Sequence, residues 1–191
     1  MRERIAEASP RFKARIAGVF YLFNVLTGAL ALVFVGRRLV VYGHAAILIA
    51  AACYIVVTLL FYSLFKPVNR SLSLLAALFS TVGCVISALS PFHLVASNIN
   101  PLVFFGFYCL LIGYLIFRST FLPRTLGVLM AFGGLCWLTF LSPLLADYLS
   151  PYNMAPAILA EVTLTVWLLV VGVNAQRWKE QAGAAGTSVR T

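Results

Sequence analysis

The stretch Pro156–Val173, PAILAEVTLTVWLLVVGV, decides how the whole chain is interpreted. Its apolar residues continue for long enough to cross a bilayer, since a spanning helix needs about 20 predominantly apolar residues. It also contains Glu161, the only acidic residue inside any long apolar segment of the chain. An acidic side chain near the bilayer centre costs about 2.5–3.5 kcal/mol on insertion scales. We therefore expect Glu161 to face a polar partner or a wet cavity.

Helical periodicity predicts which side of this stretch faces inward, because residues three or four apart share a helix face. The stripe that carries Glu161 is small or polar except for one leucine: Ala157, Glu161, Thr165, Leu168 and Gly172. The opposite stripe is aliphatic: Leu159, Val162, Val166, Val170 and Val173. Small and polar residues gather where membrane helices touch. We therefore expect Glu161 to point into a bundle and the valines to face lipid.

Composition places the remaining chain in the same class. Of its 191 residues, 62% are hydrophobic and 10% are charged. Soluble domains are about 45–50% apolar and about 25% charged, so this chain has too much apolar surface for one water-soluble core. We predict an all-α polytopic membrane protein with six transmembrane helices in one bundle.

Polar turns divide the chain into these six helices. The predicted spans are Ile16–Val35, Ala45–Phe65, Ser71–Leu89, Leu102–Phe117, Thr125–Leu145 and Pro156–Val173. Residues 1–15 form a basic N-terminus, residues 16–174 the membrane domain and residues 175–191 a polar tail whose end we expect to be disordered. Pro143 should kink or stop the fifth helix, and Asp147–Asn153 should be a loop.

The first apolar segment has a competing interpretation as a signal peptide. Ala29-Leu30-Ala31 resembles a cleavage site. However, the apolar run Ile16–Val35 is longer than the roughly 7–15 residues of a signal-peptide core. The run is therefore better explained as a transmembrane helix.

Basic residues predict the orientation. With the N-terminus in the cytoplasm and six crossings, 12 of the 14 Lys and Arg residues fall on the inside, and only Arg37 and Arg38 fall outside. By the positive-inside rule, both termini are then on the cytoplasmic side of the membrane. The net charge of +9 is explained by topology and by contact with anionic headgroups, so we expect the bilayer as a partner and no nucleic acid.

Three arginines suggest an internal repeat. Arg15, Arg70 and Arg124 each open an outward-running helix, at spacings of 55 and 54 residues. Three related helical hairpins would explain this pattern. A basic residue required before every outward helix would explain it equally well.

A crude depth estimate, at about 1.5 Å per helical residue, places several polar side chains near the level of Glu161. They are Asn24, Tyr54, Tyr108 and Thr139. Their hydroxyl and amide groups can donate to a carboxylate. We therefore predict a candidate binding site formed by Glu161 with these four residues in the outer half of the bundle. The alternative is a Glu161 whose hydrogen bonds only hold helices together.

Other reactive residues support no cofactor or metal site. Cys53, Cys84, Cys109 and Cys136 lie singly in different segments, as expected of small packing residues. His44 and His93 both lie near the outer surface, and haem ligation by the pair is disfavoured. No phosphate-binding, nucleophile-elbow or zinc-protease motif is present in the sequence. Trp137, Trp167 and Trp178 are expected to be interface anchors.

Several motifs resemble one bacterial membrane family, domain of unknown function 4386. They are Ser9-Pro10-Arg11, Arg15–Gly18, Asn24–Gly28, Lys66–Leu72, Cys109–Ser119, Leu122–Arg124, Leu126–Val128, Trp167–Leu169 and Gly172–Asn174, together with Glu161. The resemblance implies a polytopic membrane protein with no assigned activity. The chain departs from the family in shorter outer connections and in Tyr108, where the family pattern leads us to expect histidine.

Three functions remain open at this point. The first is a non-enzymatic protein that binds or moves a small or lipidic molecule at Glu161. The second is a membrane enzyme acting on a lipid or isoprenoid, with Glu161 as general acid. The third is a structural or assembly subunit of a membrane complex.

Overall fold

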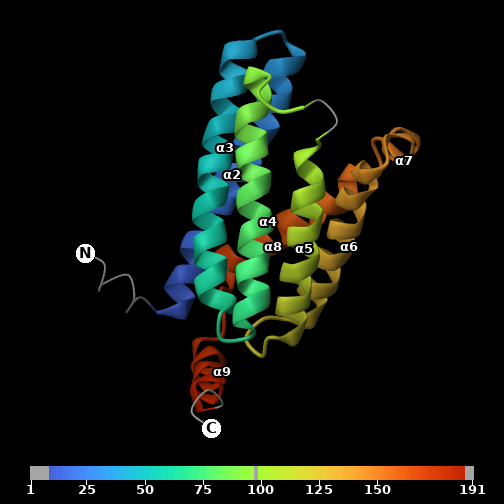
Figure 1. Ribbon diagram of the computed structural model, residues 1–191. Coiled ribbons are helices and arrows are strands. Elements are labelled where there is room, and N and C mark those ends of the chain that lie inside the picture. The colour runs from blue at the N-terminus through green and yellow to red at the C-terminus, as the bar shows by residue number, and fades with distance from the viewer. Residues whose placement is uncertain (1–8, 97–98, 188–191) are drawn as a thin grey trace.

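The computed structural model describes residues 9–96 and 99–187, and within these ranges the chain consists of helices and short connections (Figure 1). The α-helices are α2 (Pro10–Gly36), α3 (Val40–Phe65), α4 (Arg70–Leu89), α5 (Pro101–Arg118), α6 (Arg124–Leu138), α7 (Pro143–Leu149), α8 (Met154–Val170) and α9 (Ala175–Thr187). Two short 3-10 helices, η1 (Ser90–Phe92) and η2 (Thr139–Leu141), extend α4 and α6. The prediction of disorder at the end of the tail concerns residues 188–191, which lie outside the described ranges.

Five helical stretches are long and apolar enough to cross a membrane: Pro10–Phe34, Val40–Phe65, Arg70–Phe92, Pro101–Arg118 and Arg124–Leu141. The pair formed by α7 and α8, which is bent by 81°, makes a sixth if the two helices are counted as one span. The chain is thus an all-α, multi-pass membrane protein, as its composition predicts.

The first two helices begin earlier than their apolar residues predict. α2 starts at Pro10 instead of Ile16, and α3 starts at Val40 instead of Ala45. In α2, proline suits the first turn of a helix, and Arg and Lys are good helix formers, so the helix extends beyond the apolar run. Hydropathy predicts where the apolar part of a helix begins, and the helix itself can begin several residues earlier.

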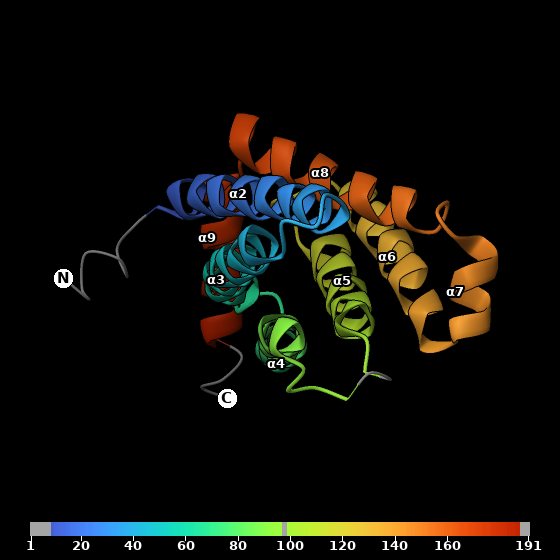
Figure 2. The same ribbon diagram turned by 90° about the horizontal axis from the view of Figure 1, so that it is seen from above.

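The fifth predicted helix is shorter than expected, and a second helix follows it. α6 ends at Leu138, well before the predicted Leu145, and Pro143 opens α7. A proline has no N–H to donate to the preceding turn, so it starts a helix more readily than it continues one. α7 therefore includes Asp147, which the sequence placed in a loop, and projects from one end of the bundle (Figures 1 and 2).

The spans pack in the order in which they occur in the chain. α2 packs on α3, α3 on α4, α4 on α5 and α5 on α6. α8 then closes the arrangement because it contacts both α6 and α2 (Figure 2). The helix that carries Glu161 is thus the element that joins the first span to the fifth.

Two pairs of glycines let α5 and α6 touch through their backbones. Gly113 faces Gly127, where a Cβ on Gly127 would lie 2.6 Å from the Gly113 carbonyl oxygen. Gly106 faces Gly134 in the same way, with a Cβ on Gly134 2.8 Å from the Gly106 oxygen. On each helix the two glycines are one heptad apart, which keeps them on one face of an antiparallel pair. Such close approach is typical of small residues in membrane helix packing.

Gly172 ends α8 and redirects the chain. Its φ of +74° lies in the left-handed region that favours glycine. Val173 is consequently only 3% exposed, so the prediction that it faces lipid is wrong. The helical register on which that prediction depended ends at Val170. Beyond the turn, the Trp178 indole N–H of α9 donates to the Leu64 carbonyl at 2.8 Å and holds the tail helix to the end of α3.

Candidate intramembrane site around Glu161

Glu161 points into the bundle, as its stripe predicts. Its Oε1 accepts a hydrogen bond from the Trp137 indole N–H at 3.0 Å, and the Cys109 thiol lies 3.8 Å from the same oxygen as a weak donor. Buried neighbours on its stripe are Ala157, Thr165 and Leu168, whereas Leu159, Val166 and Val170 are exposed. Glu161 is therefore turned away from lipid toward α5 and α6.

The contact between Trp137 and Glu161 is produced by a glycine one turn before Trp137. A Cβ on Gly133 would lie 2.9 Å from the Ala160 Cβ, so α6 and α8 pack closely at this point. Helical side chains lean toward their own N-terminus. α6 and α8 run in opposite directions, so the indole and the carboxylate lean toward each other across this contact.

Three buried tyrosines extend the site across the bundle. The Tyr21 and Tyr54 hydroxyls are 3.4 Å apart, and the Tyr54 and Tyr108 rings pack edge to face with centroids 5.7 Å apart. Tyr21 also lies close enough to Glu161 to interact with it electrostatically. The Tyr108 hydroxyl is buried and has no hydrogen-bond partner among the residues that the structure describes. An unpaired buried hydroxyl in a native structure calls for a ligand, a water or a functional explanation.

Each of the six spans contributes to one polar layer through the bundle. The Thr58 hydroxyl contacts Ser80 at 2.5 Å and also donates to the Tyr54 carbonyl, which links α4 to the tyrosines. We define the polar layer as Tyr21, Tyr54, Thr58, Ser80, Tyr108, Cys109, Trp137 and Glu161. Among the described residues, no group of three His, Cys, Asp or Glu side chains is placed to hold a metal ion.

Two of the predicted partners lie elsewhere. Thr139 is in η2, where its hydroxyl donates to the Cys136 carbonyl and accepts from the Asn153 amide at 2.9 Å. Asn24 is partly buried on α2, and its backbone carbonyl accepts from Thr27. Neither side chain hydrogen-bonds Glu161 within residues 9–96 and 99–187. The structure thus brings Tyr54 and Tyr108 into one cluster with Glu161, whereas a role for Asn24 and Thr139 stays a prediction.

Sequence reasoning missed the residues that touch the carboxylate. Trp137 was expected to anchor at the interface, and this prediction is wrong, because it is 7% exposed and bonded to Glu161. Cys109 was interpreted only as a packing residue, and Tyr21 was not among the predicted site residues. The position of Trp137 one turn after Gly133 was the one local signal, since a small residue beside a large one marks a helix contact.

Replacing Tyr108 with phenylalanine tests the unpaired hydroxyl. We expect Tyr108→Phe to raise the free energy of unfolding by about 1 kcal/mol or more, because it removes a buried polar group that has no partner. Tyr54→Phe is the matched control and should be destabilising, since it removes the Tyr21–Tyr54 hydrogen bond. Unfolding of the purified proteins in a denaturing detergent measures both. A destabilised Tyr108→Phe would show that the hydroxyl is satisfied in solution.

Comparison with known proteins finds a family model that matches the part of the chain in which Glu161 lies. Residues 92–172, which include Cys109, Trp137 and Glu161, match the family described as a domain of unknown function (DUF4386). This match covers less than half of the chain. Within the DUF4386 region lie α5, α6, α7 and α8, whereas Tyr21 and Tyr54 come from helices that precede it.

A relative of this protein is known from an archaeon. An uncharacterised protein of Archaeoglobus fulgidus is 27% identical over 140 residues, which cover 69% of this chain and 85% of that protein. No solved structure matches the chain. The function therefore has to be argued from the polar layer itself.

Proposed function

We propose that this protein binds or moves a small lipophilic molecule that carries a positive charge, with Glu161 as the group that recognises it. The observation behind the proposal is a carboxyl group inside the bundle whose two partners, an indole N–H and a thiol, are both neutral. The Lys and Arg residues of the described ranges lie in the first or last two turns of the spans, in connections or in the tail helix. A cationic ligand would supply the missing countercharge.

The aromatic residues near Glu161 favour the same ligand class. Trp137, Tyr21, Tyr54 and Tyr108 are each less than 10% exposed and surround the carboxylate from four helices. Aromatic faces attract cations, and the gain is largest where water is excluded. The unpaired Tyr108 hydroxyl adds a hydrogen-bonding group for the polar part of a ligand.

The proposed setting is the bacterial cytoplasmic membrane, with both termini in the cytoplasm. Among the described residues, Arg11, Lys13, Arg15, Lys66, Arg70, Arg118, Arg124, Arg177 and Lys179 lie at the end where α2 begins. Arg37 and Arg38 lie at the other end. This asymmetry supports the orientation through the positive-inside rule.

Binding of tetraphenylphosphonium to the purified protein tests the proposal. We expect Glu161→Gln to weaken binding about tenfold or more, because it removes the charge but keeps an oxygen acceptor for Trp137. Glu180→Gln, which changes an exposed carboxylate on α9, is the matched control and should bind normally. Tetraphenylborate, of similar shape and opposite charge, should not compete.

Two results would contradict the proposal. One is a Glu161→Gln protein that folds and binds tetraphenylphosphonium like the unchanged protein. The other is equal binding of tetraphenylborate, which would leave only apolar contact as the source of affinity.

A second candidate function is a membrane enzyme acting on a lipid or isoprenoid. The specific observation that favours it is the Cys109 thiol 3.8 Å from the Glu161 carboxylate, since a thiol beside a carboxylate is a possible nucleophile and base. Product formation by the purified protein from a lipid extract would distinguish this function from binding. A structural subunit would instead tolerate Glu161→Ala and co-purify with a partner.

A further inference from the structure

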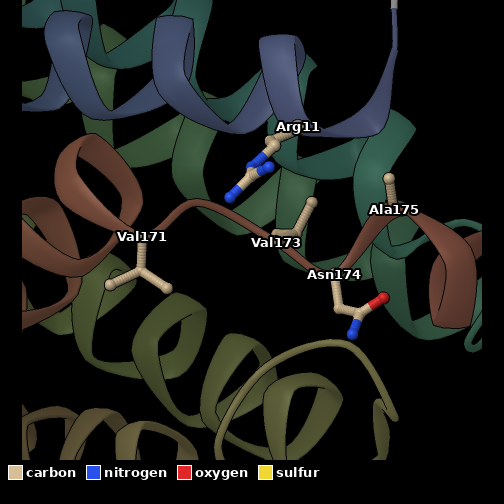
Figure 3. A pocket seen from close by; sticks show the side chains of 5 residues that line it. All are labelled: Arg11, Val171, Val173, Asn174 and Ala175. Carbon is tan, nitrogen blue, oxygen red and sulfur yellow. The ribbon is translucent and has the colours of Figure 1, made fainter.

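A hollow lies far from Glu161, at the end of the bundle where α2 begins. It is a recess of about 310 Å³ between α2 and the segment that joins α8 to α9 (Figure 3). Its lining consists of Arg11, Val171, Val173, Asn174 and Ala175. Arg11 precedes Tyr21 by about 15 Å along α2, so the recess is separate from the polar layer.

The turn at Gly172 shapes the recess. The N–H groups of Val171 and Gly172 both donate to the Trp167 carbonyl, which closes the end of α8. Gly172 then adopts its left-handed conformation, and a Cβ there would lie 3.3 Å from the Arg11 Cγ. The chain therefore passes directly beside the stem of Arg11 before it enters α9.

Arg11 supplies a positive charge that the described part of the protein leaves unpaired. Its guanidinium points into the space between α2 and the α8–α9 segment (Figure 3). The acidic residues of the described ranges are engaged or lie elsewhere: Glu161 in the polar layer, Glu180 with Gln176, and Asp147 on α7. A guanidinium that no carboxylate of the described residues pairs with is well suited to a bidentate contact with phosphate.

The apolar side of the recess favours a lipid over a free anion. Val171, 43% exposed, forms part of the wall, and it continues into the exposed face of α8 at Val170 and Val166. Phe12, next to Arg11, is 56% exposed. A molecule with a phosphate at Arg11 would thus have apolar surface beside it for its chains, which free phosphate cannot use.

We propose that this recess binds one anionic glycerophospholipid, with its phosphate held by Arg11 and its acyl chains along Val170 and Val171. Basic recesses between membrane helices are known to hold anionic headgroups. The first-turn N–H groups of α9, which begins at Ala175, add a smaller attraction for negative charge. The proposal does not depend on what Glu161 binds.

Native mass spectrometry of the full-length protein with added phosphatidylglycerol tests the proposal. We expect Arg11→Gln to lower the retained lipid about tenfold or more, the loss of a charge-assisted contact. Arg15→Gln is the matched control, because Arg15 is exposed one turn further along α2 and does not line the recess. It should retain lipid within about threefold of the unchanged protein, the scale of a surface charge.

Two further measurements distinguish a bound anionic lipid from a bound free phosphate ion. Phosphatidylcholine should be retained much less than phosphatidylglycerol, and inorganic phosphate at millimolar concentration should not displace the lipid. If Arg11→Gln and Arg15→Gln lost equal amounts of retained lipid, the proposal would be overturned, because any basic residue near the membrane surface would then attract the lipid equally well. Displacement by inorganic phosphate would overturn it in favour of a free-anion site.

Discussion

Gly127→Leu is expected to prevent normal packing of α5 against α6. A Cβ at this position would lie 2.6 Å from the Gly113 carbonyl oxygen and 2.8 Å from the Phe117 nitrogen. Both contacts are to backbone atoms, which cannot rotate aside as a side-chain tip can. Overpacking in a close-packed core costs about 1–3 kcal/mol, and here helix backbones must also separate, so we expect a loss of about 3 kcal/mol or more.

Unfolding of the purified variant in a denaturing detergent measures this loss, and the yield of monodisperse protein reports it independently. Gly28→Leu on α2 is the matched control, because a Cβ at Gly28 meets nothing within 4 Å. It should leave stability within about 1 kcal/mol, the range of helix propensity. Similar stabilities for the two variants would show that α5 and α6 do not approach as closely as described.

Gly133→Leu is expected to separate α8 from α6 and to disable the site without changing any member of the polar layer. A Cβ at Gly133 would lie 2.9 Å from the Ala160 Cβ and 3.2 Å from the Ala157 Cα. Displacing α8 would pull the carboxylate of Glu161 away from the Trp137 indole. We expect a loss of stability of about 2 kcal/mol or more and a loss of tetraphenylphosphonium binding of about tenfold or more.

Gly133→Ala tests whether the effect depends on side-chain size, since one methyl group requires a smaller displacement of α8 than an isobutyl group. Its binding should fall between that of Gly133→Leu and that of the unchanged protein. Gly28→Leu again controls for a leucine placed in a membrane helix. If a destabilised Gly133→Leu protein still bound tetraphenylphosphonium fully, ligand recognition would not depend on the Trp137–Glu161 contact. That result would contradict the proposed site.

The comparison of α8 with its sequence shows what periodicity can decide. The inward stripe of α8 follows from the 3.6-residue period of a helix, and Ala157, Thr165 and Leu168 are buried as that period predicts. Val173 departs from the pattern because the helix has ended. Helical periodicity predicts which side of a helix a residue lies on only for residues within that helix.

Estimating the membrane depth of each residue from its place in the helix predicted the site residues less well, for a geometric reason. It placed Tyr108 and Thr139 at the level of Glu161, but depth is only one coordinate of a side chain. Tyr108 lies in the cluster of rings near Glu161, whereas Thr139 lies past the end of α6 and bonds Asn153. The direction of a side chain around its helix and the order of the neighbouring helices supply the remaining coordinates, and both depend on packing.

That this is a multi-pass helical membrane protein and that Glu161 faces inward could be predicted from the sequence, because apolar length and helical period are properties of contiguous residues. The contacts of Trp137 and Cys109 with the carboxylate, and the lack of a partner for the Tyr108 hydroxyl among the described residues, could not be predicted in this way. Those contacts depend on how closely α6 approaches α5 and α8. That approach is set by glycines distant in sequence from the helix they contact.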